Sequence, residues 1–322
     1  MKAQMSNLLV LGGSGFLGRS VCAKLVERSG GASGSVLVPS RWPARARHLL
    51  LLPTLQVVQA DVNDEARLAQ LVAGCDAVVN LVAILHGSPA AFRRVHVELP
   101  AKLARVCIAG NVKRLVHVSA LGVSDRAPSH YLRSKTEGEQ VLKAARLDLS
   151  ILRPSVIFGE HDRFLNLFAD LQALFPVMPL GGAQAQFQPV WVEDVAAAVL
   201  RCLEDPATIG HTYECVGPRV YSLRDLVEMA GQMSGHPRPV IALPDALARL
   251  QAATMEFLPG EPMLSRDNID SMRTPNVATS QWPGLAALGI TPSALESIAP
   301  LYLGAGQGLS RLNRWRAKAG RR

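Results

Sequence analysis

Aromatic residues are scarce in this chain, at 5% of its 322 residues. The core must therefore be built mainly from Leu, Val, Ile and Ala, a mixture typical of helix-covered parallel sheets and not of all-β folds. The five cysteines lie far apart without a Cys-x-x-Cys pair, so we expect neither disulfides nor zinc. With 48% hydrophobic and 19% charged residues, the composition also excludes disorder and collagen.

Long apolar runs are absent too. No stretch of about 20 residues is apolar enough to span a bilayer, and no signal-peptide pattern precedes the first apolar run near Leu8. We therefore expect a soluble, cytoplasmic body. His86, His130 and His161 lie near segments of possible function, but histidines at scattered spacing are more often surface or cap residues than ligands, so we expect no metal.

Carboxylates are lacking after Glu296, and this absence explains most of the formal charge of +8. Without residues 311–322 the chain carries only about +2, so the charge does not predict nucleic-acid binding. Leu309, Leu312 and Trp315 recur every three residues among the terminal cations Arg311, Arg314, Arg316, Lys318, Arg321 and Arg322. Residues 309–322 are predicted either to dock on an anionic membrane, at the inner face of the cytoplasmic membrane, or to form a solvated terminus.

Short apolar runs alternate with helical patterns along the first half of the chain. The predicted strands are residues 7–11, 35–39, 55–59, 76–83, 114–119 and 149–153. The predicted helices are residues 16–28, 64–74, 91–110 and 130–146. This alternation predicts an α/β fold with a doubly wound parallel (Rossmann) sheet.

The pattern loosens after Pro154, where a smaller mixed C-terminal lobe is expected. The expected elements are a strand near residues 187–192, a helix from Glu193, a strand near residues 213–216, and helices at 222–235 and 245–256. Residues 258–300 are predicted to form an irregular surface wrap or a lid. The predicted organisation has three parts. They are a dinucleotide-binding domain at 1–217 with an insertion at about 160–186, a substrate or docking lobe at 218–300, and a basic tail at 301–322.

The first strand runs directly into a glycine-rich turn and then into a helix. The turn consists of Gly12, Gly13, Ser14, Gly15, Phe16, Leu17 and Gly18. Glycines allow a tight turn and close approach of the backbone to a pyrophosphate, whose charge the start of the following helix stabilises. The turn therefore predicts dinucleotide binding.

The carboxylate that accepts hydrogen bonds from an NAD ribose at the end of the second strand is missing. No Asp or Glu occurs between Glu27 and Asp61, and the strand ends instead at Arg41, which can bind a 2′-phosphate through two donors. NADP(H) is therefore favoured, with NAD(H) possible. Asp61 and Val62 close the third strand, where Asp61 would accept a bond from the adenine amino group. The alternative is an ordinary helix cap by Asp61 or Asn63.

Ser119 ends the fifth strand, and Tyr131 and Lys135 follow on one face of a helix. A tyrosine with a pKa near ~10 needs a neighbouring cation to act as acid or base at neutral pH, and Lys135 would supply it. Ser119 would orient a carbonyl or hydroxyl. The alternative is that Tyr131 and Lys135 only line the ribose and nicotinamide ring, without turnover.

Together these motifs resemble the atypical short-chain dehydrogenase/reductase superfamily. Within it, the chain is most similar to the NADPH-binding accessory subunit of respiratory complex I and its bacterial relatives. The stretches that carry the resemblance are residues 11–18, 80–83, 117–122, 131–139, 152–159 and 189–196.

The resemblance implies roles for further residues. Leu81, Val82 and Ala83 would edge the adenosine, and Pro154 and Ser155 would back the nicotinamide. Members of this group hold a nucleotide without turnover or are tied to quinone metabolism and quinone-using membrane complexes. Two functions are thus predicted: a respiratory-complex-associated protein with a structural nucleotide, or an active NADPH-dependent oxidoreductase or epimerase using Ser119, Tyr131 and Lys135.

Overall fold

The structure is a computed structural model that describes residues 6–30, 34–257 and 262–304. The chain divides into two compact units. The first comprises the chain up to Pro154 together with Glu193–Cys215 and Thr279–Thr291, and the second comprises Ser155–Val192, Val216–Ala278 and the chain from Pro292 onward. The domain boundaries expected at residues 217 and 300 remain predictions.

The first unit is built on a seven-stranded parallel sheet. In spatial order its strands are β3 (Leu55–Gln59), β2 (Ser35–Ser40), β1 (Asn7–Leu11), β4 (Ala77–Asn80), β5 (Arg114–Val118), β6 (Asp148–Pro154) and β11 (Thr212–Cys215). The order reverses between β1 and β4, which is where open α/β sheets bind ligands. Strands β4 and β5 are buried throughout because helices cover both faces of the sheet.

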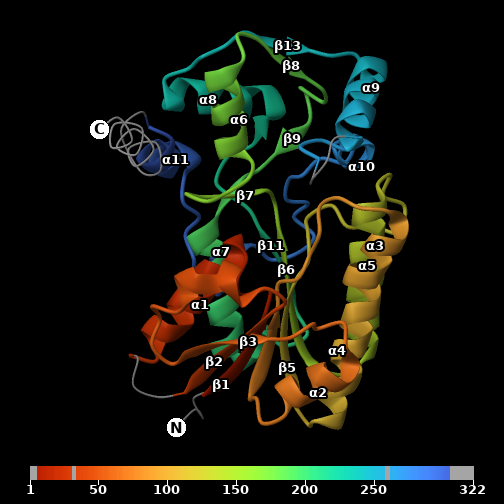
Figure 1. Ribbon diagram of the computed structural model, residues 1–322, viewed down its shortest axis with the longest axis vertical. Helices are drawn as coiled ribbons and strands as arrows, with labels where there is room; N and C mark the ends of the chain where they lie inside the picture. The colour runs from red at the N-terminus through yellow and green to blue at the C-terminus, as the bar shows by residue number, and fades with distance from the viewer. Residues whose placement is uncertain (1–5, 31–33, 258–261, 305–322) are drawn as a thin grey trace. The chain divides into compact units, whose positions relative to one another are not determined.

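Figure 1 shows α1 and α7 on one face of this sheet and α2, α4 and α5 on the other. The helices of the first unit are α1 (Phe16–Arg28), α2 (Glu65–Val72), α3 (Pro89–Arg93), α4 (Leu99–Ala109), α5 (His130–Ala144) and α7 (Val192–Glu204). Each of α2, α4 and α5 contributes a fully buried leucine to the core against the sheet, namely Leu68, Leu103 and Leu142. The predicted doubly wound parallel fold is confirmed.

The helix predicted over residues 91–110 is present over residues 89–109, but it is not α-helical throughout. It consists of α3, a π-helical turn over Arg94–Glu98, and α4. Pro100 has no backbone N–H with which to bond the carbonyl of His96 four residues earlier, so a regular α-helical ladder is interrupted at that carbonyl. The strand predicted over 76–83 likewise ends at Asn80, and residues after it form a loop.

The second unit packs helices around small two-stranded sheets. Its strands are β7 (Ile157–Phe158), β8 (Met178–Leu180), β9 (Gln186–Phe187), β10 (Val190–Trp191), β12 (Tyr221–Ser222) and β13 (Val240–Ala242). Its helices are α6 (Leu165–Leu174), α8 (Leu223–Ser234), α9 (Asp245–Glu256), α10 (Arg266–Ser271) and α11 (Leu295–Leu303). A core that includes Phe158, Leu226 and Ala299 joins α6, α8 and α11. The segment expected to be an irregular wrap over 258–300 therefore contains α10 and the start of α11.

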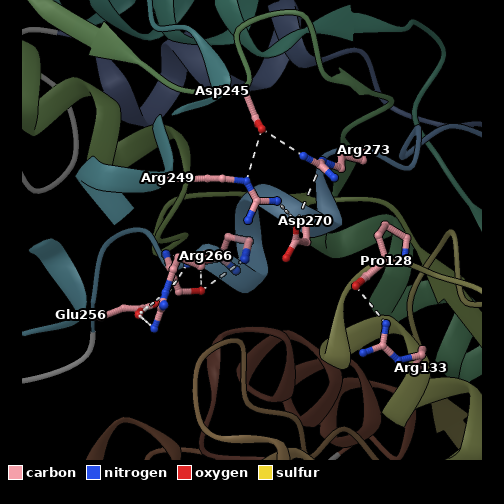
Figure 2. A network of polar contacts seen from close by, with 10 residues as sticks. Pro128, Arg133, Asp245, Arg249, Glu256, Arg266, Asp270 and Arg273 are labelled. Carbon is pink, nitrogen blue, oxygen red and sulfur yellow. Dashed lines mark hydrogen bonds and ion pairs between the residues drawn. The ribbon is translucent and has the colours of Figure 1, made fainter. Parts of the chain in front are cut away.

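Ion pairs connect α9 with α10 in the second unit, as Figure 2 shows. Asp245 accepts bonds from Arg249 at 3.2 Å and from Arg273 at 3.0 Å, and Arg249 also pairs with Asp270. The buried faces of these helices are small, with Ala248 and Ala252 against Ile269. The exposed ion pairs therefore supplement a modest apolar contact.

Within the described ranges, no helix combines the length and apolar character needed to cross a bilayer. The predicted membrane-docking segment, residues 309–322, lies outside the described residues.

Candidate functional site

The glycine-rich turn between β1 and α1 is a backbone cradle that side chains would fill. A Cβ on Gly18 would lie 2.3 Å from the carbonyl oxygen of Gly12, and Gly12 itself has a φ of +81°. A Cβ on Gly12 would also lie 3.1 Å from the backbone of Leu81. Gly15 caps α1 without a side-chain bond, so the first amides of the helix, from Phe16 onward, are available to an anion. The turn fits a pyrophosphate.

A cavity of about 340 Å³ opens beside this turn, at the point between β1 and β4 where the strand order reverses. Seven of the predicted cofactor residues line it: Gly12, Ser14, Arg41, Asp61, Val62, Val82 and Ala83. Further lining residues were not singled out from the sequence, namely Trp42, Asn63, Ile84, Val95 and Leu99. The cavity thus joins the ends of β2, β3 and β4 with the start of α4, as expected for an adenosine site at the switch point of the sheet.

Charges of both signs border this cavity. Arg41 and Arg45 lie at its β2 side, and Asp61 lies at the end of β3. A hydrogen bond from the Asn63 amide is the main reason why the pKa of Asp61 is lowered, and the charge of Arg41 adds to this effect. Asp61 accepts the Asn63 amide at 3.0 Å and is therefore held within its own loop, and both Asp61 and Arg41 line the cavity.

The three residues predicted to act on a substrate lie around the end of β5. Ser119 directly follows β5, and Lys135 Nζ donates to the Val118 carbonyl at 2.9 Å. Tyr131 lies one turn earlier on α5, with its ring edge-on to Phe92 and His96 at centroid distances of 6.1 and 5.5 Å. Burial raises the pKa of Tyr131 to about 12 and lowers that of Lys135 to about 8. The tyrosine is thus not activated by the protein alone.

A buried carboxylate lies one turn beyond Lys135 on the same helix. Glu139 is only 1% exposed and accepts two bonds from Arg153, at 2.8 and 2.6 Å. Burial alone would raise the pKa of Glu139, but the bonds and charge of Arg153 outweigh it and lower this pKa to about 2. The charge of Glu139 opposes, without cancelling, the effect of burial on Lys135.

The lowered pKa of Lys135 predicts a pH-dependent stability. In the unfolded chain the lysine titrates near 10.5, so between pH 8 and 10.5 the unfolded state binds more protons than the folded state. The cost of the buried charge is therefore present in full below pH 8 and disappears as the pH rises to 10.5. Relative to a Lys135→Met variant, we expect the unfolding free energy of the wild type to rise by about 3 kcal/mol across this window. Urea unfolding of both nucleotide-free proteins at several pH values measures this, and a constant difference would contradict it.

The two remaining predicted residues follow one another at the end of β6. Pro154 closes β6 in the first unit, and Ser155 belongs to the second unit. There the Ser155 hydroxyl donates to the side-chain oxygen of Asn276 at 2.6 Å. The nicotinamide-backing role suggested for both residues remains a prediction. Among the residues that the structure describes, no group of His, Cys, Asp or Glu side chains could hold a metal ion.

The sequence matches a protein-family model described as NAD(P)H-binding over residues 12–206. It is 31% identical over 294 residues to the mouse (Mus musculus) NADH dehydrogenase (ubiquinone) 1 alpha subcomplex subunit 9, mitochondrial, covering 89% of this chain and 77% of that protein. The Arabidopsis thaliana protein of the same name is 32% identical, with 91% and 76% covered. A ceramide reductase of Caulobacter vibrioides is 27% identical, with 73% of each chain covered.

Solved structures share the fold. An NADPH-dependent quinone oxidoreductase of Escherichia coli in complex with NADPH superposes with a TM-score of 0.72 at 20% identity, over 92% of this chain and 99% of the other. A UDP-glucose 4-epimerase of Thermotoga maritima superposes with a TM-score of 0.70 at 18% identity, over 92% and 97%. The glycine cradle, the cavity at the sheet's switch point and these similarities agree. The chain belongs to the NAD(P)H-binding family and is a homologue of the mitochondrial NADH dehydrogenase (ubiquinone) 1 alpha subcomplex subunit 9.

Proposed function

We propose that this protein holds NADP(H) as a structural or slowly exchanging cofactor and works in association with a respiratory complex I or with quinone metabolism. The observation that carries the proposal is a contrast within one unit. The glycine cradle and the cavity beside it fit the pyrophosphate and the adenosine part of a dinucleotide, whereas Tyr131 has a pKa raised to about 12 and packs edge-on against Phe92 and His96. Binding is thus better provided for than proton transfer.

The choice of NADP(H) over NAD(H) rests on the β2 side of the cavity. Arg41 and Arg45 line it together with Ser40, and the stretch from Arg28 to Ala60 contains no carboxylate. A ribose 2′-phosphate on the β2 side would be attracted by two guanidinium groups, whereas the acid that lines the same cavity, Asp61, follows β3. Asp61, the nearest downstream carboxylate, is bonded to Asn63.

The association with a respiratory complex is supported by the relatives, whose names identify them as subunits of NADH dehydrogenase (ubiquinone). In this proposal the nucleotide stabilises the fold because it binds only the native state, and the folded surface serves for docking. We place the protein in the cytoplasm, peripheral to the inner face of the cytoplasmic membrane, with the basic segment 309–322 as its contact with anionic lipid.

The dissociation rate of NADPH from the purified protein tests this proposal. The protein is loaded with labelled NADPH, excess unlabelled NADPH is added, and the loss of the bound label is followed over time. We expect a half-time of hours, because a structural ligand need not leave between reaction cycles. Exchange within seconds would overturn the structural role.

The second candidate is an active oxidoreductase or epimerase. Its supporting observation is that Tyr131 and Lys135 lie one turn apart on α5, with Lys135 bonded to the residue before Ser119. The Tyr131 hydroxyl would exchange a proton with a carbonyl, quinone or alcohol, Ser119 would orient it, and the bound nucleotide would supply hydride chemistry. In that case NADPH exchanges within seconds, and Tyr131→Phe abolishes turnover while sparing nucleotide binding.

A further inference from the structure

His96 lies in the π-helical turn between α3 and α4, 3% exposed. Because Pro100 offers no amide, the His96 carbonyl is turned toward α5, where a Cβ on Gly138 would approach it to 2.0 Å. Glycine at position 138 therefore allows the two backbones to touch. The π-helical turn and Gly138 together bring the imidazole of His96 against the helix that carries Tyr131.

The hydrogen bonds of His96 specify its tautomer. The Ile84 amide donates to Nε2 at 3.1 Å, so Nε2 carries no proton. The hydrogen of the Ser134 hydroxyl is directed to the Tyr131 carbonyl at 2.8 Å, so the hydroxyl oxygen accepts from Nδ1–H at 2.9 Å. Burial, followed by the charge of Lys135, lowers the pKa of His96 to about 2. The imidazole is therefore neutral at working pH, with its proton on Nδ1.

These two bonds join the nucleotide cavity to the helix of Tyr131. Ile84 lines the cavity together with Val82 and Ala83, in the loop after β4. The loop has a second anchor, because the side-chain oxygen of Asn80 accepts the Val82 amide at 3.2 Å. Asn80 belongs to β4 itself, whereas His96 reaches Ile84 from another element. His96 is thus the link between the far end of the loop and α5.

We propose that His96 is a positioning residue that holds the Val82–Ile84 wall of the nucleotide site through the Ile84 amide and couples this wall to the Tyr131 segment of α5 through Ser134. The proposal rests on nucleotide binding at this cavity. In this proposal the two ring nitrogens have different roles. Nε2 positions the cavity wall through the Ile84 amide, and Nδ1 contacts α5 through Ser134. A residue with a merely structural role would show no such separation.

Two substitutions of His96 by an amide side chain each keep one of its two hydrogen bonds and remove the other. In His96→Gln the side-chain amide reaches the position of Nε2 and can accept the Ile84 amide, whereas in His96→Asn it reaches only the position of Nδ1 and can donate to Ser134. We expect the dissociation constant of NADPH to rise roughly tenfold in His96→Asn and to stay within about twofold in His96→Gln, as for one lost hydrogen bond. Ser134→Ala leaves the Ile84 bond in place but removes the acceptor of Nδ1–H. We expect faster amide exchange in the Tyr131 segment of α5 and a smaller rise in the dissociation constant of NADPH than in His96→Asn.

A second measurement on the nucleotide-free protein tests the role of His96 independently of the proposed function. Amide hydrogen exchange of the peptide containing Ile84 is compared in the nucleotide-free proteins, and we expect about tenfold faster exchange in His96→Asn than in His96→Gln. Equal exchange in both variants would overturn the inference, as would equal weakening of NADPH binding while the thermal midpoints fall equally. If the wild type fails to bind NADPH, the proposed function fails, and the exchange experiment still decides the role of His96.

Discussion

Arg41→Ala is expected to raise the dissociation constant of NADPH about 30-fold while changing that of NADH less than threefold. Arg41 lines the cavity at the end of β2, and a bidentate, charge-assisted bond to a 2′-phosphate contributes about 2 kcal/mol. NADH lacks this phosphate and loses nothing when the guanidinium is removed. Fluorescence titration of both nucleotides at fixed ionic strength measures the two constants.

The control for this prediction lies six residues further on. Arg47 is exposed on the 3-10 helix Pro43–Leu49 and does not line the cavity. Arg47→Ala removes the same charge and should therefore leave both dissociation constants unchanged. Parallel weakening of NADPH and NADH in Arg41→Ala would show that Arg41 shapes the cavity and does not select the 2′-phosphate.

Arg114→Met is expected to lower the unfolding free energy by about 3–5 kcal/mol. Arg114 is 4% exposed and donates to the side chains of Ser150 and Thr208 and to backbone carbonyls that include that of Cys202 at the C-terminal end of α7. Methionine fills a similar volume but removes the guanidinium donors from these buried acceptors, which keep only the bonds among Ser150, Thr208 and the Cys202 carbonyl. Each buried acceptor that loses its partner costs about 1–3 kcal/mol. Guanidinium unfolding followed by circular dichroism measures the loss.

An exposed arginine provides the comparison. Arg105 makes a bidentate ion pair with Glu65 on the surface, with its side chain 59% exposed. Arg105→Met should leave the unfolding midpoint nearly unchanged because solvent screens such pairs. If Arg114→Met lowers the unfolding free energy no more than Arg105→Met does, the bonds of Arg114 do not hold β5, β6 and α7 together.

The elements of the first unit were predictable because their signals are local. The helix predicted over 16–28 and the strand predicted over 55–59 have the same bounds in the structure, because glycine, proline or aspartate residues flank both elements and end regular structure there. The helix predicted over 91–110 contains a π-helical turn before Pro100, which removes one amide, and an apolar period alone does not reveal this change.

The site was predictable only in part. The glycine turn, Arg41 and the Tyr131–Lys135 pair each follow from a short pattern next to a strand. Trp42, Ile84, Val95 and Leu99 reach the same cavity from different elements and belong to no pattern, so the sequence held no signal for them. His96 likewise belongs to no sequence pattern, because it is a single histidine within a helical stretch.

By itself, the sequence determined the parallel α/β architecture, the phosphate-binding turn and the missing ribose carboxylate, because each depends on residues only a few positions apart. The tertiary structure alone decided which side chains close the cavity, that Tyr131 is partly buried beside a neutral histidine, and that Arg114 meets Thr208 across 94 positions of the chain. Burial and hydrogen-bond partners depend on contacts between distant segments, and these contacts exist only once the sheet and its helices have packed.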